Sequence, residues 1–325
     1  MTNTLIVIDE VTVKRLAKWD WIIDAVERAF VSLASNAAEA FPTVLGKGSE
    51  TGTVVGAKSG LIKASASSEG KLGLKLGTYW PENPNKGLAA HGSTTLLLDD
   101  TTGFPKAIIN AHYLNGMRTA AANAVAAKYL SAPDAGTLAI FGAGNQARFE
   151  VESLRQVRNI QQVNIVNRDH VKADAFAKDL IESGIEARVC DAETAVKEAQ
   201  LITTVTAARA PLFESQWVSN GTHISAMGSD TPGKQEIPTS LFEHSRIYCD
   251  SHSQSIRIGE FQYATEEQKA KLEELGHAIA TGNCSYSSNN ITIFDSSGIG
   301  LQDVSVAGSL LEQATQQGLI KTIPF

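Results

Sequence analysis

The spacing of hydrophobic and polar positions changes along the chain and divides it into three stretches. Near the start, the apolar residues 4–8 predict a short strand, and residues 13–35 carry apolar side chains at helical spacing. Between about 52 and 110, short β-like runs alternate with glycine and polar turns, which predicts a mixed or antiparallel sheet. From residue 115 onward, an alanine-rich helix over 115–131 leads into strands that alternate with helices.

The alternating stretch predicts a parallel sheet with helices on both faces, because its strands are continuously apolar. We expect strands over 137–141, 162–166, 186–190, 200–206, 222–227 and 245–249, and helices over 146–157, 169–183 and 192–199. The last 35 residues predict a strand, a turn and a long amphipathic helix that returns to the first domain. The predicted fold class is therefore α/β, with a Rossmann-type doubly wound sheet over 116–299 and an α+β domain over 1–115 plus about 300–325.

Composition and charge narrow the class of function. The 325 residues are 43% hydrophobic and 19% charged, and the formal net charge of −7 argues against a nucleic-acid partner. The 3 cysteines lack paired spacing, so we expect reduced thiols in a cytoplasmic protein and no metal site. We also expect no signal peptide and no membrane partner, because no run approaches the roughly 18 apolar residues of a membrane span.

The stretch "LAIFGAGNQARFEVESL" (138–154) predicts a dinucleotide-binding turn between a strand and a helix. Gly142 permits a tight turn, and Gly144 lets the backbone approach a pyrophosphate because no Cβ stands in the way. Ala147 allows close packing of helix on strand, and the helix N-terminus offers N–H donors to the phosphates. A glycine turn that serves another ligand in a Rossmann-like domain is the alternative.

The end of the second strand of this domain bears on the choice of cofactor. NAD enzymes usually place Asp or Glu there to accept a hydrogen bond from the ribose 2′-OH. This chain has Asn167 followed by Arg168, and a cation beside a neutral residue favours a 2′-phosphate. We therefore expect NADPH in preference to NADH, with NADH possible; the alternative is that Arg168 only faces solvent.

Six stretches carry a family resemblance: "GLKLGTYWPEN" (73–83), "LLLDDTTGFPKAIINAHYLNGMRTAAANAVAAKYLS" (96–131), "FGAGNQA" (141–147), "TTVTA" (203–207), "MGSDTPGKQEI" (227–237) and "ITIFDSSGIGLQDV" (291–304). Together they resemble the ornithine cyclodeaminase/mu-crystallin family, and most of all its bacterial Δ1-pyrroline-2-carboxylate reductases of hydroxyproline catabolism. The resemblance implies a homodimer whose sheets join in the N-terminal domain, which also binds substrate, and a Rossmann domain after the arginine helix.

Three charged residues stand where the resemblance implies catalysis and substrate binding. Lys75 is a cation in an apolar strand and calls for an anion; the resemblance makes it the lysine that holds the substrate carboxylate. Arg118 has the fork geometry for a carboxylate or phosphate and is implied to lie between cofactor and substrate, with Thr119 close to the phosphates. Asp230 is implied as an acid/base that would protonate the substrate nitrogen or favour its iminium form. The alternatives are an edge-strand lysine for Lys75, a surface salt bridge for Arg118 and an Asx turn for Asp230.

Further cofactor positions follow from the same resemblance. Asn145 and Gln146 would cap the phosphate turn, and Thr206 and Ala207 would lie above the adenosine or nicotinamide. The remaining expected contacts are Ile224 and Met227 behind the nicotinamide ring, Ser296 facing it, and Ser297 facing the substrate.

The chain also departs from the family pattern. It lacks an arginine that many members carry after a proline near residue 45, and Lys58 stands where methionine-proline is common, so Lys58 is a candidate for the missing substrate contact. His91 lies close to the lysine strand and is a candidate proton donor, with an interior structural histidine as the alternative. Ser93, two residues on, is a candidate cofactor contact.

The favoured function is a reductase that delivers hydride from NADPH to Δ1-pyrroline-2-carboxylate and yields L-proline. Lys75, Arg118 and Lys58 would hold the carboxylate, and Asp230 or His91 would manage the proton on nitrogen. The alternatives are an ornithine cyclodeaminase, which is an ammonia lyase, an alanine-type amino-acid dehydrogenase, and a dinucleotide-bound ligand-binding protein without turnover.

Overall fold

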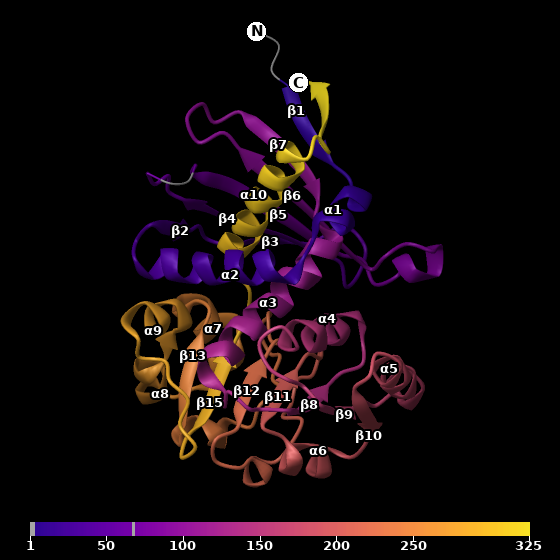
Figure 1. Ribbon diagram of the computed structural model, residues 1–325, viewed down its shortest axis with the longest axis vertical. Helices are drawn as coiled ribbons and strands as arrows, with labels where there is room; N and C mark the ends of the chain where they lie inside the picture. Colours follow the sequence, from indigo (N-terminus) through magenta and orange to yellow (C-terminus); the bar gives the residue numbers. More distant parts are fainter. Residues whose placement is uncertain (1–3, 67–68) are drawn as a thin grey trace. The chain divides into compact units, whose positions relative to one another are not determined.

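A computed structural model describes residues 4–66 and 69–325 and divides the chain into two compact units (Figure 1). The N-terminal unit holds the residues up to Arg118 together with Ile299–Phe325, and the Rossmann unit holds Thr119–Gly298. The sequence placed these boundaries at 115 and 299. The chain leaves the N-terminal unit within one helix, α3 (His112–Leu130), rather than in a linker before it.

The N-terminal unit is built on a mixed sheet. Its order is β16-β1-β7-β6-β5-β4-β2, and β3 pairs with β4 off this path. β1 runs parallel to β7, whereas the other pairs are antiparallel. The strands are β1 (Thr4–Ile8), β2 (Ala38–Ala40), β3 (Val44–Gly46), β4 (Val54–Ile62), β5 (Lys71–Tyr79), β6 (His91–Leu98), β7 (Pro105–Asn110) and β16 (Lys321–Pro324). The sequence did not predict β16.

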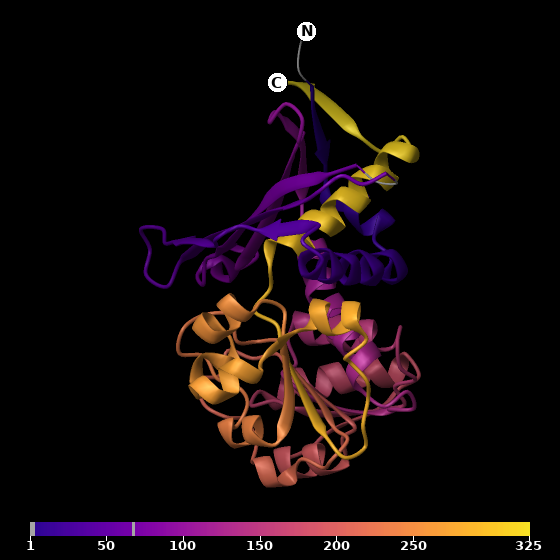
Figure 2. The ribbon, with the colours of Figure 1, turned by 90° about the vertical axis from the view of Figure 1, so that its left-hand side faces the viewer.

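Helices cover one face of this sheet. The long C-terminal helix α10 (Gly300–Gln316) packs on β4, β5 and β6, and α2 (Trp19–Ala34) packs against α10 (Figure 2). The C-terminal helix therefore returns to the first unit, as the sequence predicted. A short 3₁₀ helix, η1 (Asn83–Lys86), follows β5.

The apolar stripe over 13–35 forms two helices instead of the one continuous helix that its spacing suggested. α1 (Glu10–Leu16) ends at Ala17, which is extended, and α2 begins after Lys18. The indole of Trp21 donates a hydrogen bond of 3.1 Å to the carbonyl of Leu16, which satisfies part of the exposed end of α1. The break lets apolar side chains of both helices face the sheet.

The Rossmann unit contains a sheet of eight parallel strands, which confirms the predicted fold class. The strand order is β10-β9-β8-β11-β12-β15-β13-β14. The strands are β8 (Thr137–Phe141), β9 (Gln162–Val166), β10 (Glu186–Val189), β11 (Leu201–Thr204), β12 (His223–Ala226), β13 (Ser245–Cys249), β14 (Glu273–Glu274) and β15 (Ile291–Asp295).

Helices flank both faces of the parallel sheet. The predicted helices are α4 (Asn145–Leu154), α5 (His170–Glu182) and α6 (Ala192–Glu198). The sequence did not predict α7 (His252–Ile258), α8 (Glu266–Lys271), α9 (Leu275–Thr281) or the 3₁₀ helices η2 (Ser215–Trp217), η3 (Thr239–Glu243) and η4 (Glu260–Tyr263). One apolar cluster joins the sheet to α3, α4 and α5, and a second joins it to α6, η3 and η4. Because the strands are parallel, their carboxyl ends share one edge, where ligands bind in such folds.

The contact between β4 and α10 leaves no room for a side chain at Gly60. A Cβ there would lie 2.7 Å from the carbonyl oxygen of Glu39 and 2.7 Å from Cδ2 of Leu301. We expect Gly60→Ala to lower the free energy of unfolding by about 1–3 kcal/mol, measured by urea denaturation. Gly46→Ala in β3 is the control, since nothing lies within 4 Å of its Cβ position. Equal stabilities of the two variants would contradict this account.

Candidate functional site

The turn after β8 has the backbone geometry that a dinucleotide phosphate requires. Gly142 has φ +119°, and a Cβ there would lie 2.9 Å from the carbonyl oxygen of Val205, so glycine is required. Gly144 is the N-cap of α4, and nothing lies within 4 Å of its Cβ position. Ala147 is fully buried under the turn. The open space at Gly144 and the N–H groups of α4 fit a pyrophosphate, so the residues present fit a dinucleotide.

The first turn of α4 is tied to the interior of the unit. Gln146 donates to the buried carboxylate of Glu150 at 2.8 Å, and Asn123 of α3 donates to the same carboxylate at 2.9 Å. Asn123 also donates to the hydroxyl of Thr203 on β11 at 3.1 Å. Gln146 therefore fixes the helix, whereas Asn145 is exposed beside the turn.

Two residues expected to set the preference between NADH and NADPH, Asn167 and Arg168, lie on the loop after β9. The amide of Asn167 donates to the carbonyl of Asp169 at 2.8 Å, and Asp169 caps α5 through the N–H of Lys172. Arg168 is exposed. The preference for NADPH over NADH stays a prediction.

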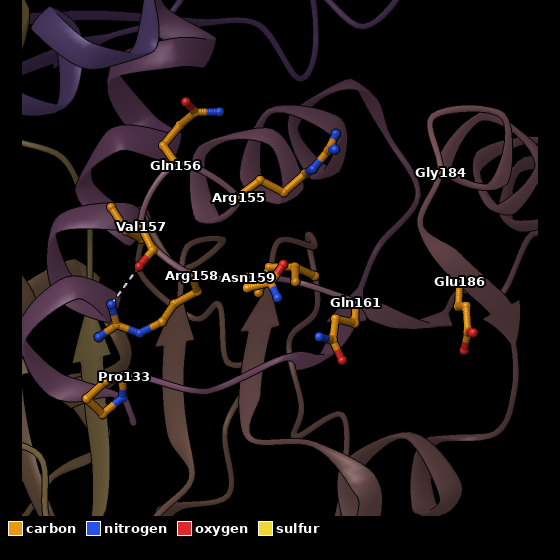
Figure 3. A pocket seen from close by; sticks show the side chains of 10 residues that line it. Pro133, Arg155, Gln156, Val157, Arg158, Asn159, Gln161, Gly184 and Glu186 are labelled. Carbon is orange, nitrogen blue, oxygen red and sulfur yellow. Dashed lines mark hydrogen bonds between the residues drawn. The ribbon is translucent and has the colours of Figure 1, made fainter.

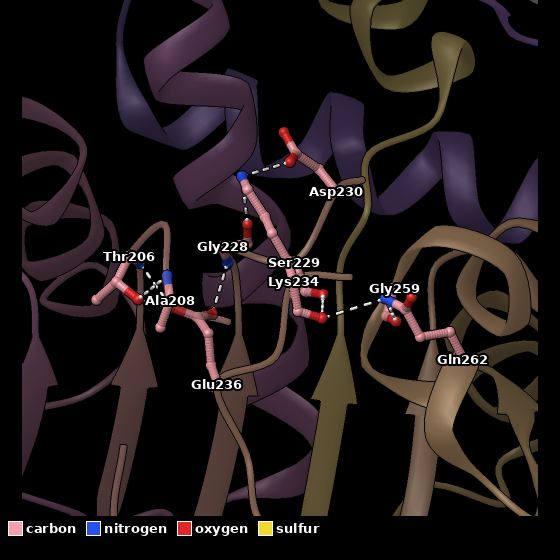
Figure 4. Close-up of polar contacts among 9 residues, drawn as sticks. All are labelled: Thr206, Ala208, Gly228, Ser229, Asp230, Lys234, Glu236, Gly259 and Gln262. Carbon is pink, nitrogen blue, oxygen red and sulfur yellow. Dashed lines mark hydrogen bonds and ion pairs between the residues drawn. The ribbon is translucent and has the colours of Figure 1, made fainter. Parts of the chain in front are cut away.

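A buried glutamate that the sequence analysis missed organises the loops at the carboxyl edge (Figure 4). The carboxylate of Glu236 accepts from the Thr204 hydroxyl at 2.8 Å and from the backbone and hydroxyl of Thr206 at 2.6 and 2.7 Å. It also accepts from the N–H of Gly228 at 2.9 Å. Glu236 thus holds the ends of β11 and β12 together and fixes Thr206. Ala207 next to it is exposed.

Two more buried carboxyls continue from Glu236 into the unit. Glu260 accepts from the N–H groups of Glu236 and Ile237 at 2.8 and 3.2 Å, and burial, with Glu236 nearby, raises the pKa of Glu260 to about 8. Asp295 accepts from the Ser255 hydroxyl, and burial raises the pKa of Asp295 well above its ordinary value. These acids are therefore protonated at a pH where exposed carboxyls are charged.

Asp230 lies on the loop after β12, as expected, and is more exposed than its neighbours (Figure 4). Its Oδ1 is 2.6 Å from Nζ of Lys234, which also donates to the carbonyl of Gly228 at 3.0 Å. This ion pair replaces the Asx turn considered as the alternative. Lys234 lies in the matching stretch "MGSDTPGKQEI", but the sequence analysis did not select it.

Some expected cofactor and substrate contacts are buried within the Rossmann unit. The hydroxyls of Ser296 and Ser297 each donate to Asp250 at 3.2 Å, so both serve the turn after β15. The side chain of Ile224 packs in an apolar core cluster, and Met227 is also buried. The placement of Ile224 and Met227 behind the nicotinamide ring stays a prediction.

In the N-terminal unit, Lys75 and Arg118 meet at a carboxylate that the sequence analysis did not select. Nζ of Lys75 is 3.3 Å from Oδ2 of Asp303, and Nε of Arg118 is 2.9 Å from Oδ1. Asn115 Oδ1 accepts from both cations at 2.9 Å, and Gln302 accepts from Arg118 at 3.0 Å. Lys75 and Arg118 are each 6% exposed and Asp303 5%, which excludes an edge-strand lysine and a surface salt bridge.

Electrostatics in this Lys75–Asp303–Arg118 cluster favour an added anion. Burial, and then the charge of Arg118, lowers the pKa of Lys75 to about 7. Burial alone would raise the pKa of Asp303, but Arg118, Lys75 and Lys58 together lower it. A bound carboxylate would favour the charged form of Lys75 and raise its pKa.

Three other expected residues lie along the same sheet. Lys58 on β4 pairs directly with Lys75 on β5. His91 pairs with Tyr79, four residues from Lys75 and so about 13 Å along the strand. The His91 ring lies 4.7 Å from that of Tyr79, and His91 is exposed, so an interior histidine is wrong. The buried hydroxyl oxygen of Ser93 has no hydrogen-bond partner among the described residues.

The Rossmann unit has a surface hollow (Figure 3). It is lined by residues that precede β8, β9 and β10, so it lies at the amino edge of the sheet. The guanidinium of Arg158 there donates to the carbonyls of Ala127, Lys128 and Ser131 and closes the C-terminus of α3. We interpret this hollow as structural, since ligands in such folds bind at the carboxyl edge.

Within residues 4–66 and 69–325, no three His, Cys, Asp or Glu side chains are grouped to hold a metal ion. In the same part of the chain, no helix combines the length and apolar character of a membrane span.

Comparison with known proteins identifies the family. Residues 3–318 match the model of the ornithine cyclodeaminase/mu-crystallin family. The chain belongs to this family. The chain is 34% identical to an iminosuccinate reductase of Paracoccus denitrificans over 98% of its length and 99% of that protein. It is 35% identical to an alanine dehydrogenase of Archaeoglobus fulgidus over 99% of both chains.

The match to a Bacillus cereus Δ1-pyrroline-2-carboxylate reductase is shorter. It has 35% identity over 78% of this chain and 81% of that protein. The expected family is thus confirmed, but the expectation that the pyrroline reductases stand nearest is wrong, because the other two matches span the whole chain.

Solved structures of family members superpose over nearly the whole chain. The Paracoccus denitrificans iminosuccinate reductase with NAD⁺ has a TM-score of 0.92 at 33% identity and covers 99% of this chain and 100% of its own. An archaeal alanine dehydrogenase dimer with bound NAD reaches 0.91 at 31%, with the same coverage. The Thermococcus litoralis Δ1-pyrroline-2-carboxylate reductase with NADH and L-proline reaches 0.90 at 26%, covering 98% and 100%. The chain is an NAD(P)-dependent oxidoreductase of this family.

The two turn glycines give a test that separates folding from cofactor binding. Gly144→Ala should change the free energy of unfolding by less than about 1 kcal/mol, because its Cβ meets open space, yet weaken NADH binding by crowding the phosphate. Gly142→Ala should destabilise the protein itself, since its φ of +119° strains any Cβ. Urea denaturation without cofactor and a fluorescence titration with NADH measure the two effects. Unchanged NADH binding in Gly144→Ala would place the pyrophosphate elsewhere.

The raised pKa of Glu260 predicts a pH-dependent stability. The group ionises near 4.5 when unfolded and near 8 when folded, so the native state binds the extra proton between these values. The free energy of unfolding should therefore fall as pH rises from 5 to 8, by up to a few kcal/mol. Glu260→Gln, which mimics the neutral acid, should flatten this fall in urea denaturation. The exposed Glu267→Gln is the control and should keep the wild-type slope.

Proposed function

We propose that this protein uses NAD(P)H to reduce the C=N bond of a small α-imino carboxylate to an amino acid. The observation that carries the proposal is the buried Lys75–Asp303–Arg118 cluster, in which two cations share one carboxylate. Such a cluster binds the carboxylate next to a reacting carbon well, because burial strengthens each charge interaction. The names of the relatives support this chemistry, since an amino-acid dehydrogenase working in reverse also reduces a C=N bond.

Individual residues then take distinct roles. When bound, the reduced cofactor supplies hydride to the imine carbon while the nitrogen takes a proton and the oxidised cofactor is released. Lys75 binds the substrate carboxylate, and Arg118 positions it while holding Asp303, Gln302 and Asn115 through its three nitrogens. Asp230 favours the protonated iminium, whose carbon accepts hydride more readily, and Lys234 holds Asp230 in place.

The preferred cofactor and the assembly are tested beside the substrate. Exposed Arg168 and neutral Asn167 would let a 2′-phosphate bind, which favours NADPH, whereas the solved relatives hold NAD⁺ or NADH. A homodimer through the N-terminal unit would cover apolar side chains that are exposed there, including Val44, Leu45 and Leu76.

Two candidate substrates should be assayed first. Δ1-Pyrroline-2-carboxylate, which would yield L-proline, is the cyclic candidate that the sequence motifs favour. Iminosuccinate is the acyclic candidate, and the full-length match to the Paracoccus denitrificans enzyme favours it. Ornithine cyclodeamination and alanine oxidation are the alternatives, and ammonia release from L-ornithine or NAD⁺ reduction by L-alanine would reveal them.

The pKa of Lys75 gives the decisive kinetic test. Only protonated Lys75 attracts the carboxylate, so KM for the imino acid should rise as pH increases above about 7. Lys75→Met should raise KM by about 30-fold or more, and its KM should no longer follow this pH profile. Lys71→Met on the same strand is the control, because Lys71 pairs with Glu312 away from the cluster. A wild-type KM that is constant from pH 6 to 9 would contradict the role of Lys75.

A further inference from the structure

Glu236 joins two loops at the carboxyl edge of the parallel sheet and uses both of its carboxylate oxygens to do so (Figure 4). Oε1 accepts from the N–H and the hydroxyl of Thr206, at 2.6 and 2.7 Å. Oε2 accepts from the hydroxyl of Thr204 at 2.8 Å and from the N–H of Gly228 at 2.9 Å. A carboxylate offers about four lone-pair sites, so these donors occupy all of them.

This geometry requires a carboxylate rather than an amide at position 236. Each oxygen faces one backbone N–H, from Thr206 or from Gly228, and a backbone N–H can only donate. The side chain of a glutamine would place its NH₂ group against one of these N–H groups, whichever way the amide were turned. Glu236→Gln would therefore release one of the two loops, although the two side chains have nearly the same shape.

The two loops are also packed directly on each other. A Cβ on Gly228 would lie 2.3 Å from the carbonyl oxygen of Thr206 and 2.6 Å from Oε1 of Glu236. The Thr206 hydroxyl, which donates to Glu236, also accepts from the N–H of Ala208 at 3.1 Å. Lys234 donates to the carbonyl of Gly228, so both backbone groups of Gly228 are bonded. Glu236 therefore fixes the position of one loop against the other.

The strand order places these loops on one half of the dinucleotide-binding edge. The strands β10-β9-β8-β11-β12-β15 follow the order of the doubly wound dinucleotide-binding fold, which consists of two mononucleotide-binding halves. The turn at Gly144 follows β8, and Asn167 and Arg168, expected to meet the adenosine ribose, follow β9. The loops that Glu236 joins follow β11 and β12, and so belong to the other half.

We propose that Glu236 is a positioning residue for the nicotinamide half of NAD(P)H, because it holds the loops after β11 and β12 in the arrangement that receives the ring. Glu236 is fully buried, so it acts through Thr206 and Gly228 rather than by touching the cofactor. The adenosine and the pyrophosphate are bound by the other half of the sheet and do not depend on Glu236. This inference concerns the cofactor, so it does not depend on which imine is reduced.

Calorimetric titrations with NADH and with ADP-ribose separate this role from a general effect on folding. ADP-ribose shares the adenosine and the pyrophosphate with NADH but lacks the nicotinamide ring. We expect Glu236→Gln to weaken NADH binding by about 10-fold or more, while ADP-ribose binding changes by less than about threefold. The exposed Glu243→Gln is the control and should bind both ligands as the wild type does. NADPH and 2′-phospho-ADP-ribose replace this pair if the 2′-phosphate is preferred.

Two further variants test the same division of the site. Thr204→Val removes one of the donors to Glu236 and leaves both loops unchanged, so it should weaken NADH binding by about threefold and leave ADP-ribose binding unchanged. Gly144→Ala should weaken the binding of both ligands, because both carry the pyrophosphate.

The outcomes distinguish this inference from the proposed function. Urea denaturation shows whether each variant is folded, and Thr204→Val provides the test if Glu236→Gln is not. Equal weakening of both ligands, or unchanged NADH binding, overturns the inference. A wild-type protein that reduces no imine overturns the proposed function instead, and leaves the comparison of NADH with ADP-ribose valid.

Discussion

The carboxylate of Asp303, held between Lys75 and Arg118, ties together the parts of the N-terminal unit on which its chemistry depends. It joins the middle strand β5, the start of α3 and the first turn of α10, segments that lie far apart in the chain. Among the described residues of this unit, the buried charged side chains are Lys75, Arg118 and Asp303. Removing Asp303 would leave two buried cations without their carboxylate, which is more costly than losing a surface pair.

The two units stabilise their buried ionisable groups in different ways. The described part of the N-terminal unit pairs its two buried cations, Lys75 and Arg118, with the one carboxylate of Asp303. The described part of the Rossmann unit buries carboxyls without a buried Lys or Arg, namely Glu150, Glu236, Asp250, Glu260 and Asp295. Backbone N–H groups and hydroxyls hold most of these acids, so Glu236 can fix the loops at the carboxyl edge without a cation.

Features encoded by local sequence patterns were predictable. β1, β8, β9 and β13 have the predicted bounds, because short apolar runs between polar turns mark buried strands. The turn at Gly142 was also recognisable, since its chemistry is confined to a few neighbouring residues. The break at Ala17 carries no proline or glycine, and β16 is too short to show a period, so neither was visible.

The candidate site was predictable only where a charge stood in apolar surroundings. Lys75 and Arg118 met that criterion, and Asp303 in "GLQDV" meets it too, so the same signal could have identified the third member. Glu236 and Glu260 did not meet it, and their partners, backbone N–H groups and the hydroxyls of Thr204 and Thr206, give no charge signal in the sequence. The exposure of His91 was not predictable, because strand alternation does not show which end of a strand is covered.

The division of the N-terminal unit between two distant segments constrains how the protein is made. The Rossmann unit is one continuous stretch, Thr119–Gly298, and the whole of it is synthesised between Arg118 and Asp303. During that interval Lys75 and Arg118 lack their counter-ion, and β1 lacks its antiparallel neighbour. The Lys75–Asp303–Arg118 cluster can therefore form only after the start of α10 has been synthesised.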